Sequence, residues 1–138
     1  MVAAQTAGEV QVRVHHESDV AIARLRVFEL ATRHGLAEPA AAALATAVTE
    51  VARNMIAHAG GGNIAAIAVE ETGRRGVLVT GCDDGPGIDD IDRAMTDGFS
   101  TTGSLGLGLP GARRLVDEFE IESRVGVGTR VTLRKWAR

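Results

Sequence analysis

A glutamate and an asparagine four residues apart form the first pair in this sequence that could carry out chemistry. Glu50 and Asn54 lie in a segment with an apolar residue every three or four positions, so they share one face of a predicted helix. A carboxylate can accept a proton or orient an attacking hydroxyl, and an amide oxygen is a hard ligand suited to Mg²⁺. The same spacing is common on solvated helix faces, so the pair alone does not define a site.

Two glycine-rich segments could bring backbone close to a ligand. The first, Asp83-Asp84-Gly85-Pro86-Gly87-Ile88, follows a predicted strand. Its leading carboxylate could accept a hydrogen bond from an exocyclic amine such as that of adenine, and its glycines would let the backbone approach a flat base. The second runs from Gly103 to Gly111 and opens a predicted helix, whose free N–H groups favour an anion such as phosphate. Each segment alone could be an ordinary turn, so their order along the chain carries the prediction.

These segments need a framework of strands and helices, which hydrophobic periodicity and turn residues predict. The first expected helix runs from about Ser18 to His34 with an apolar face that includes Ile22, Leu25 and Phe28, and the second runs from Pro39 to His58. We expect strands at 10–14, 63–70, 76–82, 119–125 and 130–134, with 71–75 as a hairpin loop. A long connection over 83–105 holds one short helix within 88–96, and a helix follows at 106–118. Hairpin-joined strands with three main helices predict an α+β, two-layer sandwich.

Composition limits the class of protein. A chain of 138 residues predicts one domain, here 9–138 after a flexible leader at 1–8. A net charge of −3 and the scarcity of aromatic residues argue against a nucleic-acid partner, and no apolar run is long enough for a membrane span. The single cysteine, Cys82, fits a cytoplasmic protein. A Walker A loop needs a lysine before Ser or Thr, and a eukaryotic-type kinase needs a lysine on an early strand. The single lysine, Lys135, lies four residues from the end of the given sequence and fits neither position, so both classes are excluded.

The three segments in this order resemble the Bergerat ATP-binding domain shared by gyrase, Hsp90 and histidine kinases. The segment from Glu50 to Asn54 resembles its N box, Asp83-x-Gly85-x-Gly87 its first glycine box, Gly106-Leu-Gly-Leu its second, and Gly128-Thr129 its late Gly-Thr pair. The strings Asp97-Gly-Phe-Ser-Thr101 and Lys135-Trp136 narrow the resemblance to the serine kinases that regulate anti-sigma factors, in the branch of the stressosome switch kinases. The resemblance covers about 10–138 and implies a mixed, mainly antiparallel sheet with helices on one face.

The resemblance also implies a role for each matching residue. Glu50 would act as general base or orient the attacking hydroxyl, Asn54 would hold Mg²⁺ between the phosphates of ATP, and Asp83 would bind the adenine. The other implied ATP-binding residues are Arg53, His58, Gly85, Gly87, Ile88, Ser100, Thr101, Thr102, Gly103, Leu105, Gly106, Leu107, Gly108 and Thr129.

Three positions keep alternatives open. Asp84 stands where much of the superfamily has asparagine, and it either adds a carboxylate near the base or faces solvent. His58 either contacts a phosphate or is a favourable charge at a helix C-terminus. Arg53 either forms a surface salt bridge or meets the γ-phosphate or the acceptor loop of a partner.

The function implied by the resemblance is a serine/threonine protein kinase of a bacterial stress and sigma-factor cascade. It would use Mg-ATP to phosphorylate a STAS-domain partner, and would then bind and activate a PP2C-type phosphatase. The alternative is an ATP-dependent anti-sigma factor that sequesters a sigma factor, and the local strings favour the kinase. A nucleotide-binding module without transfer activity is a third possibility, against which the intact Glu50 and Asn54 argue. The sequence leaves the partner proteins, the upstream signal and the oligomeric state open.

Overall fold

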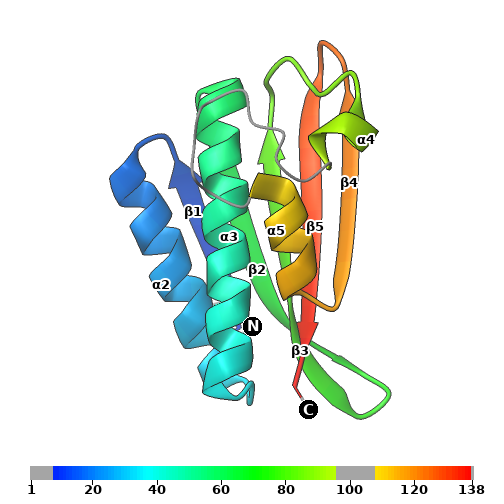
Figure 1. Cartoon of the computed structure of the whole chain (residues 1–138). Helices are drawn as coiled ribbons and strands as arrows, with labels where there is room; N and C mark the ends of the chain where they lie inside the picture. Colours follow the sequence, from blue (N-terminus) through cyan, green and yellow to red (C-terminus); the bar gives the residue numbers. More distant parts are fainter. Residues whose placement is uncertain (1–7, 96–107, 138) are drawn as a thin grey trace.

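The computed structural model describes residues 8–95 and 108–137, which form a layer of helices on a layer of strands (Figure 1). The helices are α2 (Glu17–Arg33), α3 (Glu38–Ala59), α4 (Ile91–Ala94) and α5 (Gly108–Leu115). The strands are β1 (Glu9–Val14), β2 (Gly62–Glu71), β3 (Arg74–Asp83), β4 (Glu118–Arg124) and β5 (Gly128–Trp136). The predicted α+β sandwich is confirmed.

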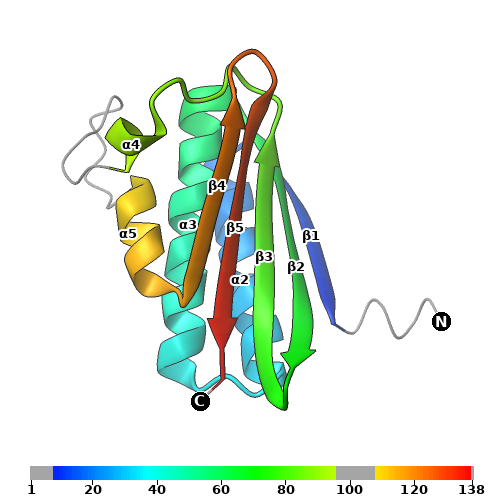
Figure 2. The ribbon, with the colours of Figure 1, turned by 90° about the vertical axis from the view of Figure 1, so that its right-hand side faces the viewer.

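The described strands form one sheet in the order β1-β2-β3-β5-β4, and every neighbouring pair is antiparallel. The expected mixed sheet is therefore wrong for this part of the chain, because no described pair runs parallel. Figure 2 shows the sheet in front of the helices, which cover only its far side. A sheet of this kind buries alternate residues of each strand and leaves the others toward solvent.

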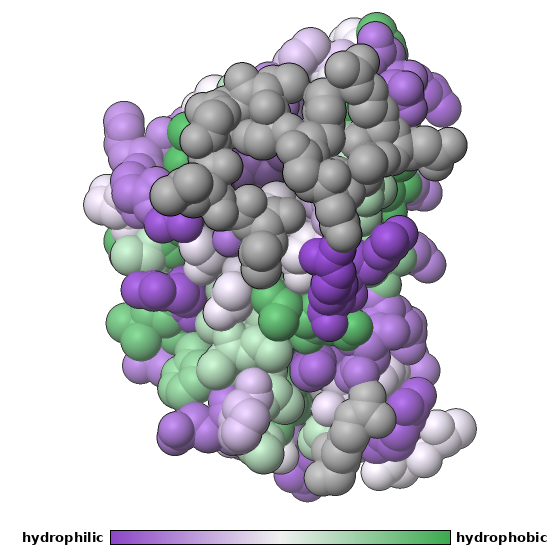
Figure 3. Space-filling view, in the orientation of Figure 1, coloured by the Kyte–Doolittle hydropathy of each residue, from purple (hydrophilic) through white to green (hydrophobic). Residues whose placement is uncertain are grey.

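The core lies between the sheet and the helices. Facing residues of neighbouring strands, such as Val12 with Ile64 and Val79 with Leu133, are buried against the helix layer. Helix α3 runs across the middle of this layer and is rich in alanine, which lets it lie close to the strands. Its alanines continue onto the solvent side, and hydrophobic residues accordingly gather on the lower part of this face (Figure 3).

The face that α2 buries differs from the predicted one. Its buried residues are Val20, Ala23, Val27, Leu30 and Ala31. Two members of the predicted apolar face are instead exposed, Ile22 at 43% and Leu25 at 57%. Residues spaced by three drift around a helix with 3.6 residues per turn, so this spacing alone does not fix the buried side.

Helix α2 also begins earlier than predicted, at Glu17 rather than Ser18. The carboxylate of Asp19 accepts hydrogen bonds from the backbone N–H groups of His15 and His16 at 2.9 and 3.0 Å. These two bonds hold the pKa of Asp19 below its ordinary value. Asp19, in the first turn of α2, therefore fixes the start of the helix.

Two other predicted boundaries are corrected. The β2–β3 hairpin turns at Thr72 and Gly73, which both have positive φ, so its loop is shorter than the expected 71–75. Helix α5 ends at Leu115 rather than 118. The N–H of Asp117 donates to the carbonyl of Arg134 at 3.0 Å, and the N–H of Trp136 donates to the carboxylate of Asp117 at 2.8 Å. These bonds attach the chain after α5 to β5.

The other predicted elements are confirmed within a few residues, including the short helix α4 inside the long connection. Most of the expected leader, 1–7, and the later part of the connection, 96–107, lie outside the described residues. Among the described helices, none combines the length and the apolar character that crossing a membrane requires.

The last strand is held to β4 by a cluster around Trp136, which is 2% exposed. Its indole N–H donates to Glu118 at 3.0 Å, and the guanidinium of Arg134 binds the other oxygen of that carboxylate at 2.8 Å. The guanidinium of Arg74 lies 4.1 Å from the centre of the Trp136 ring. The bond from Trp136 and the ion pair with Arg134 lower the pKa of Glu118 below its ordinary value of 4.5.

We expect Glu118→Gln to lower the stability of the protein at neutral pH, measured as the melting temperature. A carboxyl group whose pKa is lower in the folded state stabilises the fold above its ordinary pKa. That contribution disappears as the pH falls from about 4.5 through the lowered pKa. The difference between wild type and variant should therefore shrink in acid. Glu120→Gln, on the same strand, is the control, and an equal effect of both variants at every pH would contradict this account.

Candidate functional site

Helix α3 presents Glu50 to the start of α5, where the residue is only 9% exposed. Its Oε1 accepts a hydrogen bond of 3.0 Å from the backbone N–H of Gly108, the first residue of α5. A buried carboxylate is costly without such a partner, and the N-terminus of a helix is favourable for negative charge. Glu50 thus ties the middle of α3 to the start of α5, which pack side by side (Figure 1).

The neighbouring polar residues of α3 lie in different environments. Asn54 is half-buried one turn after Glu50, on the same side of the helix. Arg53 is exposed, and its guanidinium binds the carboxylate of Glu17 at 2.9 Å. His58 is exposed in the last turn of α3, where a positive charge is favourable. The structure thus shows the surface salt bridge for Arg53 and the helix-end position for His58.

A tight turn follows β3 and packs between the end of α3 and the β4–β5 hairpin. The carboxylate of Asp83, the last residue of β3, accepts the N–H of Gly85 at 2.9 Å. A Cβ on Gly85 would collide with Ala59 of α3, and a Cβ on Gly87, whose φ is +80°, would meet the carbonyl oxygen of Arg124. Both glycines are therefore required by close approach of backbone. Asp84 in the same turn is exposed.

One hydroxyl joins this turn to the end of the sheet. The Oγ of Ser123 accepts the N–H of Ile88 at 2.7 Å and lies 2.8 Å from the hydroxyl of Thr129 and 3.2 Å from the carbonyl of Gly128. Thr129 is 8% exposed and pairs with Asp83 across β3 and β5. Paired residues share one face of a sheet, so Asp83, Thr129 and Ser123 all face the helix layer.

Ser123 is the site residue that the sequence analysis missed. Phe119 and Ile121 alternate with charged residues along β4, and Ser123 continues their inward-facing series. A small polar residue at the third inward position was the available signal, because a buried hydroxyl normally has a specific hydrogen-bond partner.

Part of the predicted site cannot be placed. The positions Ser100, Thr101, Thr102, Gly103, Leu105, Gly106 and Leu107 lie outside the described residues. Of the second glycine box, the structure places Gly108, which has a φ of +65° at the first position of α5.

The described residues thus present a buried carboxylate, a half-buried amide, the start of a helix and a strand-end carboxylate on the helix side of the sheet. Among them, no group of three or more His, Cys, Asp and Glu side chains could hold a metal ion by itself. The amide oxygen of Asn54 is nevertheless a suitable single ligand for Mg²⁺, which usually takes few protein ligands and completes its shell with water and phosphate oxygens. The donor set therefore fits Mg²⁺ only together with a phosphate-bearing ligand.

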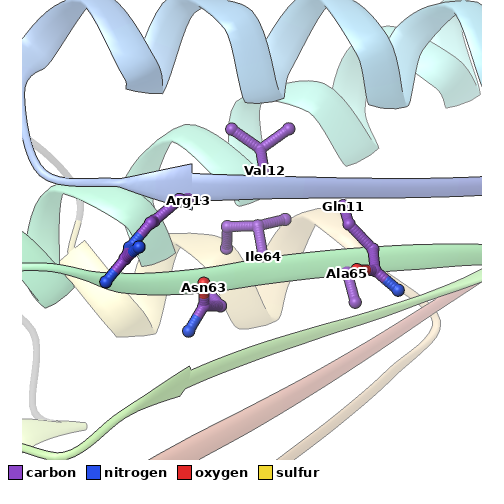
Figure 4. Close-up of a pocket in the computed structure, with 6 residues that line it drawn as sticks. All are labelled: Gln11, Val12, Arg13, Asn63, Ile64 and Ala65. Atoms are coloured by element: carbon purple, nitrogen blue, oxygen red, sulfur yellow. The ribbon is translucent and has the colours of Figure 1, made fainter.

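A separate depression of about 300 Å³ lies between β1 and β2 and does not belong to this site. It is lined by Gln11, Val12, Arg13, Asn63, Ile64 and Ala65. Figure 4 shows Val12 and Ile64 pointing toward the helices and Gln11, Arg13 and Asn63 pointing to the opposite side.

Known proteins match this chain over most of its length. The family model described as the histidine kinase-like ATPase domain matches residues 6–135. The serine/threonine-protein kinase RsbT of Bacillus subtilis (strain 168) is 42% identical over 127 residues, which cover 92% of this chain and 96% of that protein. An anti-sigma F factor of Thermoanaerobacter sp. (strain X514) is 33% identical over 96 residues, which cover 66% of each chain. These matches confirm the resemblance to the ATP-binding domain of histidine kinases, and also the narrower resemblance to the serine kinases of the stressosome branch.

We expect Ser123→Ala to weaken ATP binding about three- to tenfold, because one net hydrogen bond is worth about 1 kcal/mol and the Ile88 N–H loses its acceptor. Titration calorimetry with a non-hydrolysable ATP analogue measures this change. Ser123→Thr keeps the hydroxyl and should retain most of the affinity. Unchanged affinity in Ser123→Ala would show that the bond does not position the turn for nucleotide binding.

Proposed function

This chain belongs to the family of histidine kinase-like ATPase domains, and we propose that it is a serine/threonine protein kinase that uses Mg-ATP. The observation that carries the proposal is the placement of Glu50, a buried carboxylate held at the start of α5 with Asn54 one turn away. The proposed general base and the helix start that would bind phosphate are thereby joined directly by one hydrogen bond. The similarity to RsbT over nearly the whole chain supports the same activity.

The turn after β3 forms the adenine end of the proposed site. One carboxylate oxygen of Asp83 is occupied by the N–H of Gly85, which orients the second oxygen toward an exocyclic amine. Gly85 and Gly87 let this turn lie against Ala59 of α3 and the backbone of Arg124, so they shape the turn and do not themselves face the base. Thr129 and Ile88 complete this end of the site, and Ser123 holds them in place.

The phosphate end of the proposed site lies between α3 and the start of α5. The N–H groups at the first turn of α5 would bind phosphate oxygens, together with the second glycine box from Gly103 to Gly108 and the hydroxyls of Ser100, Thr101 and Thr102. Asn54 would hold Mg²⁺ against the phosphates, and the bound ion would supply neutralisation of their charge. Arg53 and His58 would join the phosphates only after side-chain movement, because Arg53 binds Glu17 and His58 is exposed.

Phosphoryl transfer in this site needs one proton acceptor. The hydroxyl oxygen of the acceptor side chain would attack the γ-phosphorus while Glu50 takes its proton. The bond between the γ-phosphorus and the bridging oxygen breaks, and that oxygen leaves with ADP. Glu50 already uses Oε1 for the N–H of Gly108, so Oε2 is the oxygen that would accept the proton.

The proposed acceptor is a serine or threonine of a STAS-domain protein, and the proposed later partner is a PP2C-type phosphatase that the kinase activates in the cytoplasm. The similarity to RsbT supports this partner-switching role. The matches to anti-sigma F factors favour one alternative, an ATP-dependent protein that sequesters a sigma factor. The higher identity and coverage of the match to RsbT favour the kinase.

We expect Glu50→Gln to lower the rate of phosphoryl transfer about 10²–10⁴-fold, the usual contribution of a general base. Glutamine retains an oxygen that can accept the Gly108 N–H, so nucleotide affinity and melting temperature should stay near those of wild type. Transfer from radiolabelled ATP to a purified STAS-domain protein is the measurement. Glu50→Ala is the companion variant, because it also removes the bond to α5 and should lower the melting temperature.

A result with normal transfer in Glu50→Gln would remove Glu50 from its role as base. A wild-type protein that binds Mg-ATP, transfers no phosphate to any STAS-domain protein and retains a purified sigma factor would favour the sequestering alternative instead.

A further inference from the structure

Strand β4 forms the end of the described sheet farthest from β1, and its outer edge pairs with no other described strand (Figure 1). Alternate residues of an edge strand direct their backbone N–H and C=O groups away from the sheet. An extended segment of another protein can pair with these groups and so add one strand to the sheet. The side chains on the two faces of β4 indicate what kind of segment fits there.

The face of β4 that carries no helix is acidic. Glu118, Glu120 and Glu122 occupy three successive outward positions, and all three are exposed. Glu118 and Glu122 each lie within 4.0 Å of an arginine of β5. Glu120 lies opposite Thr132 of β5, and no salt bridge joins it to another described residue. The middle of β4 therefore presents a carboxylate whose charge the neighbouring strand does not compensate.

The opposite face of β4 is apolar and incompletely covered. Phe119 and Ile121 point toward the helix layer but are only half-buried. Among the described elements, β4 makes extensive contact with β5 alone. On the other edge strand, β1, the inward residues Val10, Val12 and Val14 are buried beneath α2. Apolar surface at β4 thus remains available for burial by an added strand.

We propose that β4 binds an extended segment of a partner protein in which basic and apolar residues alternate. The segment pairs with the open edge of β4, and side chains on one face of neighbouring strands lie about 5 Å apart. Its basic side chains then meet the glutamates of β4, and its apolar side chains cover Phe119 and Ile121. A basic residue beside Glu120 contributes most, because that carboxylate has no such partner among the described residues.

Charge disfavours other occupants of this edge. A second copy that paired through β4 about Glu120 would place Glu118 opposite Glu122, and like charges that face each other are destabilising. An acidic segment would meet the same repulsion, so the edge selects a basic strand by rejecting the alternatives. Binding at this edge does not depend on the proposed kinase activity, so either can fail without the other.

A peptide titration provides the test, with the ¹⁵N-labelled full chain in the absence of nucleotide. The probe is a capped peptide of alternating lysine and valine with the 7 residues of β4 as its length. It should shift the amide signals of β4 saturably, with a dissociation constant below about 1 mM. A peptide of alternating glutamate and valine should cause no saturable change.

Charge reversal on β4 tests the acidic face. Glu120→Lys should weaken binding of the lysine peptide about fivefold or more and should allow the glutamate peptide to bind. Glu9→Lys makes the same charge change at an exposed position of β1 and is the matched control, which should leave the affinity within about twofold of wild type. Both positions are exposed, so the melting temperatures of both variants should stay close to that of wild type.

N-methylation of the lysine peptide separates strand pairing from attraction between charges. A paired strand directs only alternate N–H groups toward β4, so methylating one set of nitrogens, lysine or valine, should abolish binding, and methylating the other should not. Two methylated peptides that behave alike would overturn the proposal. Signal changes centred outside β4, absence of binding at millimolar peptide, or equal weakening by Glu120→Lys and Glu9→Lys would overturn it as well.

Discussion

The structure depends on one buried carboxylate that must have a partner. Glu50 lies in the middle of α3, buried beside the start of α5, where an unpaired charge would be strongly unfavourable. The first N–H of α5 satisfies it. Because the donor is backbone, the contact sets the position of a whole helix rather than of one side chain. The carboxylate and the helix start that would bind phosphate are consequently held together by the fold itself.

The opposite end of the site is set by close packing of backbone. The turn after β3 has no room for side chains at Gly85 or Gly87, since α3 lies on one side and the β4–β5 hairpin on the other. Ser123 and Thr129 then fix the turn to the sheet with hydrogen bonds. The glycines allow the turn to approach α3 and the hairpin closely. The hydroxyl of Ser123 fixes the orientation of the turn relative to the sheet. The helix layer and the sheet thus each provide one end of the proposed nucleotide site.

The sequence predicted those features of the fold that depend on residues near one another in the chain. The long stripe of α3 predicted its bounds closely. Two of the segments that the motif order linked, those with Glu50 and Gly108, are in contact in the structure. The sequence did not predict features that are set by contacts between segments distant along the chain. Leu25 fits an apolar helix face by spacing, yet the sheet lies on the other side of α2. The end of α5 is set by bonds from Asp117 to β5, and the role of Ser123 depends on a turn distant in sequence.

The proposed nucleotide site extends from the turn after β3 to the start of α5. Amide chemical shifts of the ¹⁵N-labelled protein, recorded during titration with Mg²⁺ and a non-hydrolysable ATP analogue, report where the nucleotide binds. The account predicts the largest changes at Gly85, Gly87, Gly108 and Thr129, with little change along β1. Changes centred on Gln11, together with an unaffected Gly108, would place the nucleotide in the depression between β1 and β2 and contradict the proposed site.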